Sequence, residues 1–459
     1  MSTPTTSLRG ARRHFSARPV LFLAFAFAVM ADPVSSVAYA IEAALRSLNG
    51  HLALLIPTMG LVIGIIALVT LNYSQLVAAF PQGGGSPEAA GRAFGEAWSF
   101  LPIGALVVDF ALTIAISIAA AGSALIAFAP ALASLRIPLA LVLLVAVAGL
   151  TWFGHGGRLL FGLMTISFIV IGTLVLVLGF TDPHSSHGHA PITGSASPAL
   201  IAVILAFPVA MALATGTEAP ATSIGQLGEL GEQGKRRFGQ GTLALTIVIV
   251  GGLTMGLTVL AVHLHVGIPG ADQTQISNLA KAAAGSGALF GFFQIASGLL
   301  LLAAASSSFQ AGPGLLRALA RSGDGSLLPA AMGRTNRHHT PVWAVVVYAV
   351  ISAGIILVAQ GQEQELVLVY AVAVFLSFLA GLLAMARFTY RRGSTVLAAT
   401  NLLAAIVVVF TLIINLLRGY PLISMAATAL VAAGLFWRWV RAGRPAGLEA
   451  IEREAEAEE

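Results

Sequence analysis

Apolar runs long enough to cross a lipid bilayer recur along almost the whole chain, and short polar or glycine- and proline-rich stretches separate them. A transmembrane helix needs about 20 predominantly apolar residues. The pattern predicts twelve spans, over residues 19–46, 50–80, 97–130, 137–154, 158–181, 196–224, 239–267, 284–320, 341–360, 362–388, 395–418 and 420–440. We therefore expect an all-α integral membrane protein with about twelve transmembrane helices.

Basic residues are distributed very unequally between the two sets of loops that these spans define. Twenty of the 24 lysines and arginines fall in one set of loops and tails, and the other set holds only Arg46, Arg136, Lys281 and Arg418. Cytoplasmic loops of membrane proteins carry an excess of basic residues. This asymmetry predicts a multi-pass protein of the cell inner (plasma) membrane with both termini in the cytoplasm.

The spans also predict the domain organisation. Residues 1–18 form a basic cytoplasmic tail, residues 19–440 the transmembrane domain, and residues 441–459 a short cytoplasmic tail that ends in an acidic stretch. Within the transmembrane domain, residues 19–181 and 196–388 are expected to be inverted repeats, followed by two extra helices over residues 395–440. We expect no appended soluble domain.

Composition excludes several classes of function. Hydrophobic residues make up 57% of the chain and charged residues only 9%, whereas a soluble domain has about 25% charged residues. The chain has no cysteine, so a disulfide, a thiol nucleophile and a thiolate metal site are excluded. The net charge of +5 comes from loop arginines and does not indicate a nucleic-acid partner. No motif supports an enzyme, a cofactor or a transition-metal site, and the expected surroundings are the lipid bilayer.

Two predicted helices at corresponding places in the two repeats are interrupted near their middles. Helix 1 contains Ala31-Asp32-Pro33-Val34-Ser35-Ser36, and helix 6 contains Thr215-Gly216-Thr217-Glu218-Ala219-Pro220. Proline and glycine break helices, and irregular backbone is tolerated within a membrane only where it lines a cavity or is buried in protein. Matching breaks in two repeats are typical of an inverted-repeat transporter and indicate its binding site. Two ordinary proline kinks are the alternative.

Three carboxylic acids lie within predicted spans and away from the span ends: Asp32, Asp109 and Glu218. Each costs roughly 2.5–3.5 kcal/mol at the centre of a membrane helix on insertion scales. No lysine or arginine is predicted at the same depth. A bound cation or a proton is therefore the expected partner of these acids, and hydrogen bonds to neighbouring backbone are the structural alternative.

Further oxygen-bearing side chains accompany these acids. Asp109, Thr113 and Ser117 are spaced at i, i+4 and i+8, which places them on one face of helix 3. Carboxylate and hydroxyl oxygens suit a hard cation, although the two hydroxyls could instead bond to their own helix. Tyr39 and Tyr370 lie inside helices 1 and 10, where a packing role and a ligand role both stay open.

Several of these segments resemble the KUP-type potassium transporters, and especially their KimA-like branch, in the amino acid–polyamine–organocation (APC) superfamily. The matching segments occur in order from about residue 20 to residue 390, and they are Asp32–Tyr39, Phe80–Ser86, Asp109–Thr113, Thr215–Ala219, Ala304–Phe309 and Leu368–Val372. The segment Arg337-His338-His339-Thr340-Pro341-Val342-Trp343 is more similar to amino acid permeases.

The resemblance implies a LeuT-like fold, with five helices, five inverted helices and two more, and proton-coupled uptake of potassium. By motif position, the potassium path would be lined by Asp32, Tyr39, Asp109, Thr113, Ser117, Thr215 and Tyr370, and Glu218 would be the proton-linked carboxyl group. The transported potassium ion and proton would be the ligands, and a homodimer stays open.

A proton-coupled amino acid or polyamine permease is the alternative function. Amino acid carriers of this fold use free backbone amides in the break of helix 1 to bind the substrate carboxylate. Asp32 occupies that region here, and its charge would repel a carboxylate but attract a cation or an amine. The sequence therefore favours potassium and keeps an organic amine open. A sensor or scaffold fits poorly with three intramembrane acids.

Overall fold

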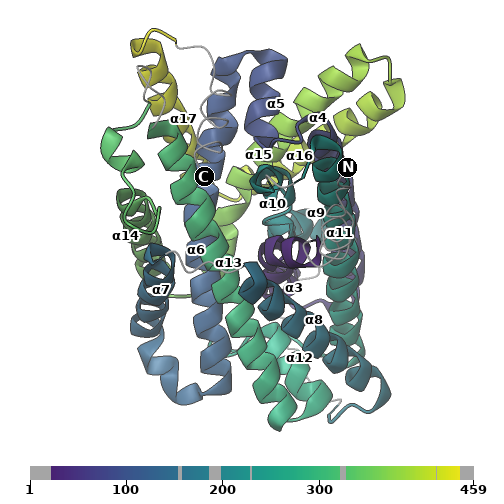
Figure 1. The fold of residues 1–459 in the computed structure, drawn as a ribbon. Helices are drawn as coiled ribbons and strands as arrows, with labels where there is room; N and C mark the ends of the chain where they lie inside the picture. The colour runs from purple at the N-terminus through teal and green to yellow at the C-terminus, as the bar shows by residue number, and fades with distance from the viewer. Residues whose placement is uncertain are drawn as a thin grey trace, which may run out of the picture.

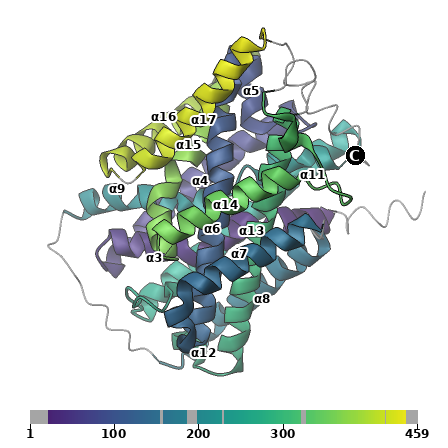
Figure 2. The same ribbon diagram turned by 90° about the vertical axis from the view of Figure 1, so that its left-hand side faces the viewer.

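The chain forms an elongated bundle of helices (Figures 1 and 2). This computed structural model describes residues 22–153, 158–185, 198–227, 230–320, 327–419 and 421–444. Ten helical segments in these ranges are long and apolar enough to cross a membrane. Most of the predicted tails at residues 1–18 and 441–459 lies outside the described residues.

The long helices follow the predicted spans closely. Those with an uninterrupted course are α4 (Leu55–Ala79), α6 (Phe100–Phe128), α7 (Arg136–Trp152), α8 (Arg158–Thr181), α11 (Glu232–His263), α13 (Ala288–Ala320), α14 (Val342–Val358), α15 (Glu363–Arg391), α16 (Thr395–Leu417) and α17 (Leu422–Arg441). The 3-10 turns η1 (Leu52–Leu54), η2 (Glu96–Ser99) and η3 (Pro130–Leu135) precede α4, α6 and α7, and η7 (Ala330–Gly333) lies between α13 and α14. The agreement arises because an apolar run of bilayer length has few alternatives to a helix in lipid.

Both predicted breaks are present, but they differ in kind. Predicted helix 1 consists of a helical stretch over residues 22–29, then α2 (Ala31–Ser35) and α3 (Val37–Ser47), with Met30 and Ser36 between them in right-handed helical conformation. Predicted helix 6 consists of α9 (Ala199–Ala210), η4 (Met211–Ala214), α10 (Ala219–Ser223) and η5 (Ile224–Gln226), and Gly216 adopts φ +73° between η4 and α10. Helix 1 is therefore interrupted without unwinding, whereas helix 6 is opened at residues 215–218.

Two short helices were not predicted. They are α5 (Gly85–Phe94), between α4 and α6, and α12 (Gln275–Ala284), between α11 and α13. Each has only ten residues, too few to cross a bilayer, so neither is predicted by its apolar length. In addition, α11 begins at Glu232, ahead of the predicted start at 239, because a polar, charged turn extends the helix beyond its apolar part.

The buried centre of the bundle is α6, which packs against α13, α15 and α17. Gly104 permits the approach of α17, since a Cβ atom there would lie 2.9 Å from both the Ala432 nitrogen and the Thr428 oxygen. The α2 segment packs against α13, and α3 packs against α9. The middle parts of the two interrupted helices, residues 30–45 and 206–218, are thus enclosed by other helices, whereas the start of α9 is exposed.

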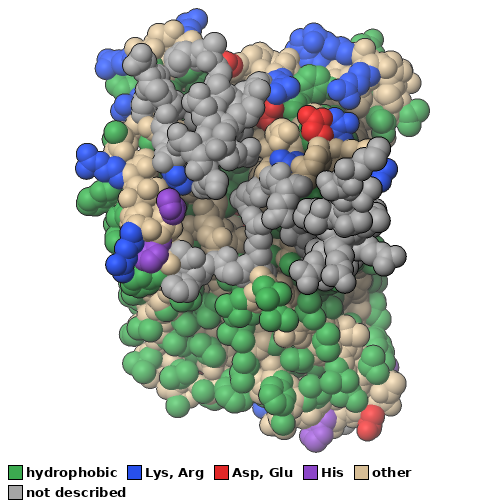
Figure 3. Space-filling model, in the orientation of Figure 1, with side chains coloured by type: hydrophobic (Ala, Val, Ile, Leu, Met, Phe, Trp, Pro, Cys, Tyr) green, Lys and Arg blue, Asp and Glu red, His purple; other side chains and the backbone are tan. Residues whose placement is uncertain are grey.

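The outer surface is apolar over much of its height. Large hydrophobic side chains are exposed on the outer helices, among them Val145, Val170, Leu200 and Val350. In Figure 3 hydrophobic side chains cover the lower half of the visible face, while Lys and Arg side chains gather in the upper half. This distribution is typical of a protein that sits in a bilayer with one strongly basic side.

Candidate functional site

The two interrupted helices meet at Asp32 and Gly216. A Cβ atom on Gly216 would lie 2.7 Å from Asp32 Cγ, 2.8 Å from Asp32 Cβ and 2.9 Å from Asp32 Oδ2. No side chain could be accommodated at such distances without displacing the carboxyl group, and the positive φ of Gly216 also favours glycine. Glycine at this position therefore allows the Asp32 carboxyl group to lie against the opened backbone of helix 6.

Hydroxyl groups tie the breaks to each other and to their own backbone. Ser36 Oγ is 2.7 Å from the Pro33 carbonyl oxygen and 3.0 Å from the Leu213 carbonyl oxygen, which belongs to η4. The Thr215 and Thr217 hydroxyls donate to the carbonyl oxygens of Ala212 and Ala214 at 2.6 and 2.9 Å. These bonds occupy carbonyl oxygens near the break of helix 6, as burial in a membrane requires.

The second acid, Asp109, comes from α6 and lies beside Glu218 and Tyr370. Its side chain faces the Tyr370 hydroxyl and the Glu218 carboxyl group, and Thr113 Oγ1 lies 3.4 Å from the Tyr370 hydroxyl oxygen. Asp32 is also close enough to interact electrostatically with Asp109 and Glu218. The structure thus brings together all three predicted acids, two of which are in side-chain contact.

These three acids are buried, and part of their hydrogen-bonding capacity is unused. Asp32, Asp109 and Glu218 have 7%, 3% and 6% of their surface exposed. Within the described residues, Asp32 Oδ1, Asp109 Oδ1 and Glu218 Oε2 have no hydrogen-bond partner, and no ion pair involves these side chains. A buried carboxyl oxygen without a partner carries a substantial desolvation cost, so a ligand that binds these oxygens would be stabilised.

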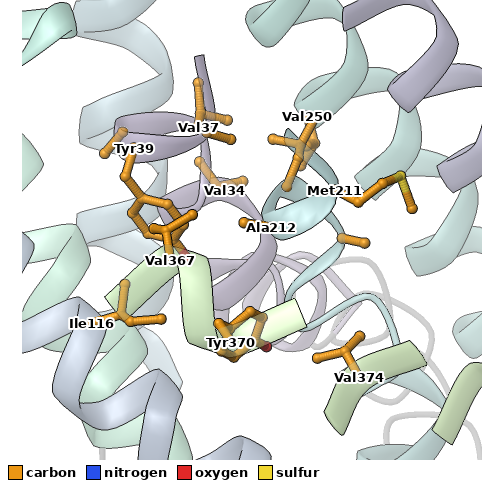
Figure 4. Packing of buried hydrophobic residues seen from close by; sticks show 14 of the residues in the cluster. Val34, Val37, Tyr39, Ile116, Met211, Ala212, Val250, Val367, Tyr370 and Val374 are labelled. Carbon is orange, nitrogen blue, oxygen red and sulfur yellow. The ribbon is translucent and has the colours of Figure 1, made fainter. Parts of the chain in front are cut away.

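The remaining predicted residues line the same region. Tyr39 interacts with Thr215 across the two helices, and Ser117 Oγ is buried and, among the described side chains, has no partner. Figure 4 shows the rings of Tyr39 and Tyr370 among apolar side chains that include Val34, Ile116 and Val367. The polar groups therefore project from an otherwise apolar core.

Four buried residues of potential importance were not predicted. Ser306 and Ser308 on α13 have buried hydroxyls with no partner among the described residues, and α13 packs against both α2 and α6. Glu42 and Glu363 are 1% and 5% exposed, so the set of buried acids is larger than the three that were predicted. The signals in the sequence were the i, i+4 spacing of Glu42 and Arg46, and the run of polar residues Gln362-Glu363-Gln364-Glu365 at the start of an apolar helix.

The chemistry of the donor set restricts what could bind. Carboxylate and carbonyl oxygens bind protons, hard cations or amines and repel anions, and hydroxyl oxygens can join them as ligands of a cation. In the described part of the chain, no group of three His, Asp or Glu side chains is compact enough to hold a metal centre. The arrangement is therefore a dispersed array of oxygens around the two breaks.

Comparisons with known proteins identify the family of the chain. The family profile for amino acid permeases matches residues 21–441. The chain is 30% identical over 363 residues to the potassium transporter KimA of Bacillus subtilis, an alignment that covers 76% of this chain and 58% of that protein. The chain therefore aligns with less than two thirds of the length of this relative.

Solved structures resemble the fold. Two crystal structures of a manganese transporter from Eremococcus coleocola, both of single-residue mutants, each superpose with a TM-score of 0.52 at 14% identity and cover 95% of both chains. This likeness confirms the predicted LeuT-like class of fold. The family profile and the relative are those of transporters and not of enzymes. The chain belongs to the amino acid permease family of the APC superfamily and is a multi-pass membrane transporter.

Proposed function

We propose that this protein is a proton-coupled transporter of potassium ions. The observation that carries the proposal is the convergence of Asp32, Asp109 and Glu218, each buried and each with an oxygen that lacks a partner among the described residues. A small cation can be bound by such oxygens without the carboxylate-binding group that an amino acid substrate needs. The similarity to a protein named as a potassium transporter supports the same substrate.

The proposed roles follow from the contacts. Potassium is bound along a path formed by Asp32, Tyr39, Asp109, Thr113, Ser117, Thr215 and Tyr370, which supply carboxylate, hydroxyl and phenol oxygens. Glu218 carries the coupled proton, because it contacts Asp109 directly. Two adjacent carboxyl groups resist bearing full negative charge together, so a cation bound at Asp109 and a proton on Glu218 are energetically linked.

The driving force then has two parts. With both termini in the cytoplasm, as the arginine-rich loops indicate, a membrane potential that is negative inside favours inward movement of a cation by about 2.3 kcal/mol per charge per 100 mV. An inward proton gradient acting through Glu218 adds to this drive. Uphill uptake depends on the coupling, whereas binding alone does not.

A proton-coupled carrier of amines or amino acids is the second candidate. It is favoured by the amino acid permease profile that matches residues 21–441. The Asp32 carboxyl group beside the break would bind the ammonium group of such a substrate. In this case the carboxyl oxygens would bind an organic cation in place of potassium.

Uptake of radioactive rubidium, as a potassium surrogate, into proteoliposomes under an inward proton gradient tests the proposal. Amino acids and polyamines are measured in parallel with the same vesicles. We expect saturable rubidium uptake that potassium inhibits competitively and that a protonophore abolishes. Absence of rubidium uptake together with uptake of an amine or amino acid would overturn the proposal in favour of the second candidate.

A further inference from the structure

A partly buried network of charged side chains lies beyond the candidate site, toward the side of the bundle opposite the arginine-rich loops. We name the charged residues Glu42, Arg46, Arg136, Asp272 and Glu363 the outer clasp. Arg136 has 8% of its surface exposed, and Glu42 and Glu363 have 1% and 5%. Charges at this level of burial are retained only where they are paired and hydrogen-bonded.

One half of the outer clasp binds α3 to the segment that precedes α12. Glu42 Oε1 accepts a hydrogen bond from Arg46 Nε at 2.8 Å, and Glu42 Oε2 accepts one from the backbone nitrogen of Gln275, the first residue of α12, at 2.8 Å. Arg46 also contacts the Pro269 carbonyl oxygen at 3.3 Å. A carboxylate at a helix N-terminus is favoured by the helix dipole, so Glu42 holds α12 against the end of helix 1.

The other half binds the same segment to α6, α7 and α15. Arg136 donates to the Ala271 carbonyl oxygen at 2.8 Å and to Asp272 Oδ1 at 3.0 Å. It also donates to Ser123 Oγ at 2.8 Å, and Ser123 donates to Glu363 Oε2 at 2.6 Å. The carboxyl groups of Glu42 and Glu363 are close enough to interact electrostatically, and each half of the outer clasp places an arginine near its carboxyl group.

The outer clasp is directly connected to the candidate site. Glu42 lies one helical turn after Tyr39 on α3, and Gln364, next to Glu363, donates to the Tyr39 carbonyl oxygen at 3.4 Å. On α6, Ser123 follows Ser117 by a rise of about 9 Å along the helix axis. The outer clasp thus reaches both α3 and α6, the helices that carry Tyr39 and Ser117.

We infer that the outer clasp is the gate that closes the transport site toward the outside, and that the segment over residues 264–274 and α12 are released from α3 and α7 when it opens. A carrier has to expose its site to each side in turn, so contacts that bridge its moving elements have to break. Water that enters on opening solvates the separated charges, which makes a polar gate reversible. The inference rests on the proposed transport function and orientation, but not on the identity of the substrate.

The absence of cysteine from the sequence provides a clean test. The reporter is Ala120→Cys, at a residue with 4% of its surface exposed that lies on α6 between Ser117 and Ser123. A membrane-impermeant methanethiosulfonate reagent is added to intact cells and, separately, to inverted membrane vesicles. The labelling rate from each side reports how often the site is open to that side, whether or not the protein transports potassium.

Two variants weaken the outer clasp in the reporter background. Arg136→Gln removes the bridging guanidinium group. Its control is Arg418→Gln, an arginine predicted on the same side that is not a member of the outer clasp. Asp272→Asn weakens the ion pair between Arg136 and Asp272. The Asp272 side chain is 55% exposed, so this change carries little risk of misfolding. Its control is Asp182→Asn, at another exposed residue. We expect labelling from outside to accelerate about tenfold in Arg136→Gln and about threefold in Asp272→Asn, because loss of clasp bonds shifts the population toward the open state.

Labelling from inverted vesicles should not accelerate in either variant, and both controls should label like the unmodified reporter. Outside labelling that is unchanged in both clasp variants would overturn the inference. Equal acceleration in a variant and its control, or acceleration only from the inside, would overturn it as well. Rubidium uptake by the same variants is recorded separately, so a failure of the proposed function is distinguishable from a failure of the gate.

Discussion

Replacement of Gly216 by alanine should damage the candidate site more than any other single added methyl group at the breaks. The new Cβ atom would lie within 2.9 Å of three Asp32 atoms, and the backbone there has φ +73°. A left-handed conformation costs a non-glycine residue roughly 1–2 kcal/mol, and an extra carbon in a packed core costs typically about 1–3 kcal/mol. The combined cost is therefore about 2–5 kcal/mol, and the steric part acts directly on Asp32.

Binding and stability measurements separate the two parts of this cost. Since about 1.4 kcal/mol corresponds to a factor of ten, displacement of Asp32 should weaken binding of the transported cation at least about tenfold, as measured by calorimetry on the purified protein. The Tm of the protein in detergent should fall as well. Gly64→Ala is the control, since a Cβ atom there meets nothing within 4 Å and the residue lies inside α4. Wild-type affinity and Tm in Gly216→Ala would refute the argument that only glycine fits between helix 6 and Asp32.

Three further substitutions probe other parts of the site. Glu218→Gln should make rubidium uptake independent of external pH, whereas uptake by the wild type should increase as the outside is acidified. A variant whose rubidium flux keeps the pH profile of the wild type would exclude Glu218 as the proton carrier. Ser36→Ala removes the hydroxyl that bridges to the Leu213 carbonyl oxygen and should lower the free energy of unfolding by about 0.5–1.5 kcal/mol. Its Tm should therefore be lower than that of the control Ser167→Ala, which lies on the exposed face of α8. Equal Tm values for the two variants would argue against the bridge. Tyr370→Phe removes the hydroxyl beside Asp109 and Thr113. It should weaken cation binding severalfold, measured by calorimetry, without a large change in Tm. An unchanged cation affinity would leave Tyr370 with a packing role only.

The positions of the long helices could be predicted from the sequence because apolar length alone determines them. The α4 helix with its preceding turn η1 spans Leu52–Ala79, against the prediction of 50–80, and α8 spans Arg158–Thr181, as predicted. The interruptions near Asp32 and Gly216 were likewise visible as proline, glycine and acidic residues inside apolar runs. The sequence does not predict how far each helix unwinds. Helix 1 keeps helical dihedral angles at Met30 and Ser36, because a proline near the start of the short helix α2 does not disrupt it.

The sequence identified the acids that the structure brings together, but not their contacts with one another. The three acids were identified because each is costly within a membrane, and the structure places them close together. The apposition of Asp32 and Gly216 could not be predicted, since it depends on how two segments far apart in the sequence pack together. The outer clasp was missed for a related reason. Glu42, Arg136 and Glu363 lie near helix ends, where charged residues are ordinary, and only tertiary packing buries them.

Binding of potassium to purified Asp109→Asn protein, measured by calorimetry beside the wild type, tests whether the buried acids bind the transported ion. Asp109 is the acid that contacts both Glu218 and Tyr370, and Asp182→Asn, at an exposed residue after α8, removes the same charge outside the site. We expect saturable potassium binding in the wild type and in Asp182→Asn, and loss of at least about tenfold in affinity, or about 1.4 kcal/mol, in Asp109→Asn. Potassium affinity in Asp109→Asn equal to that of the wild type would contradict this expectation.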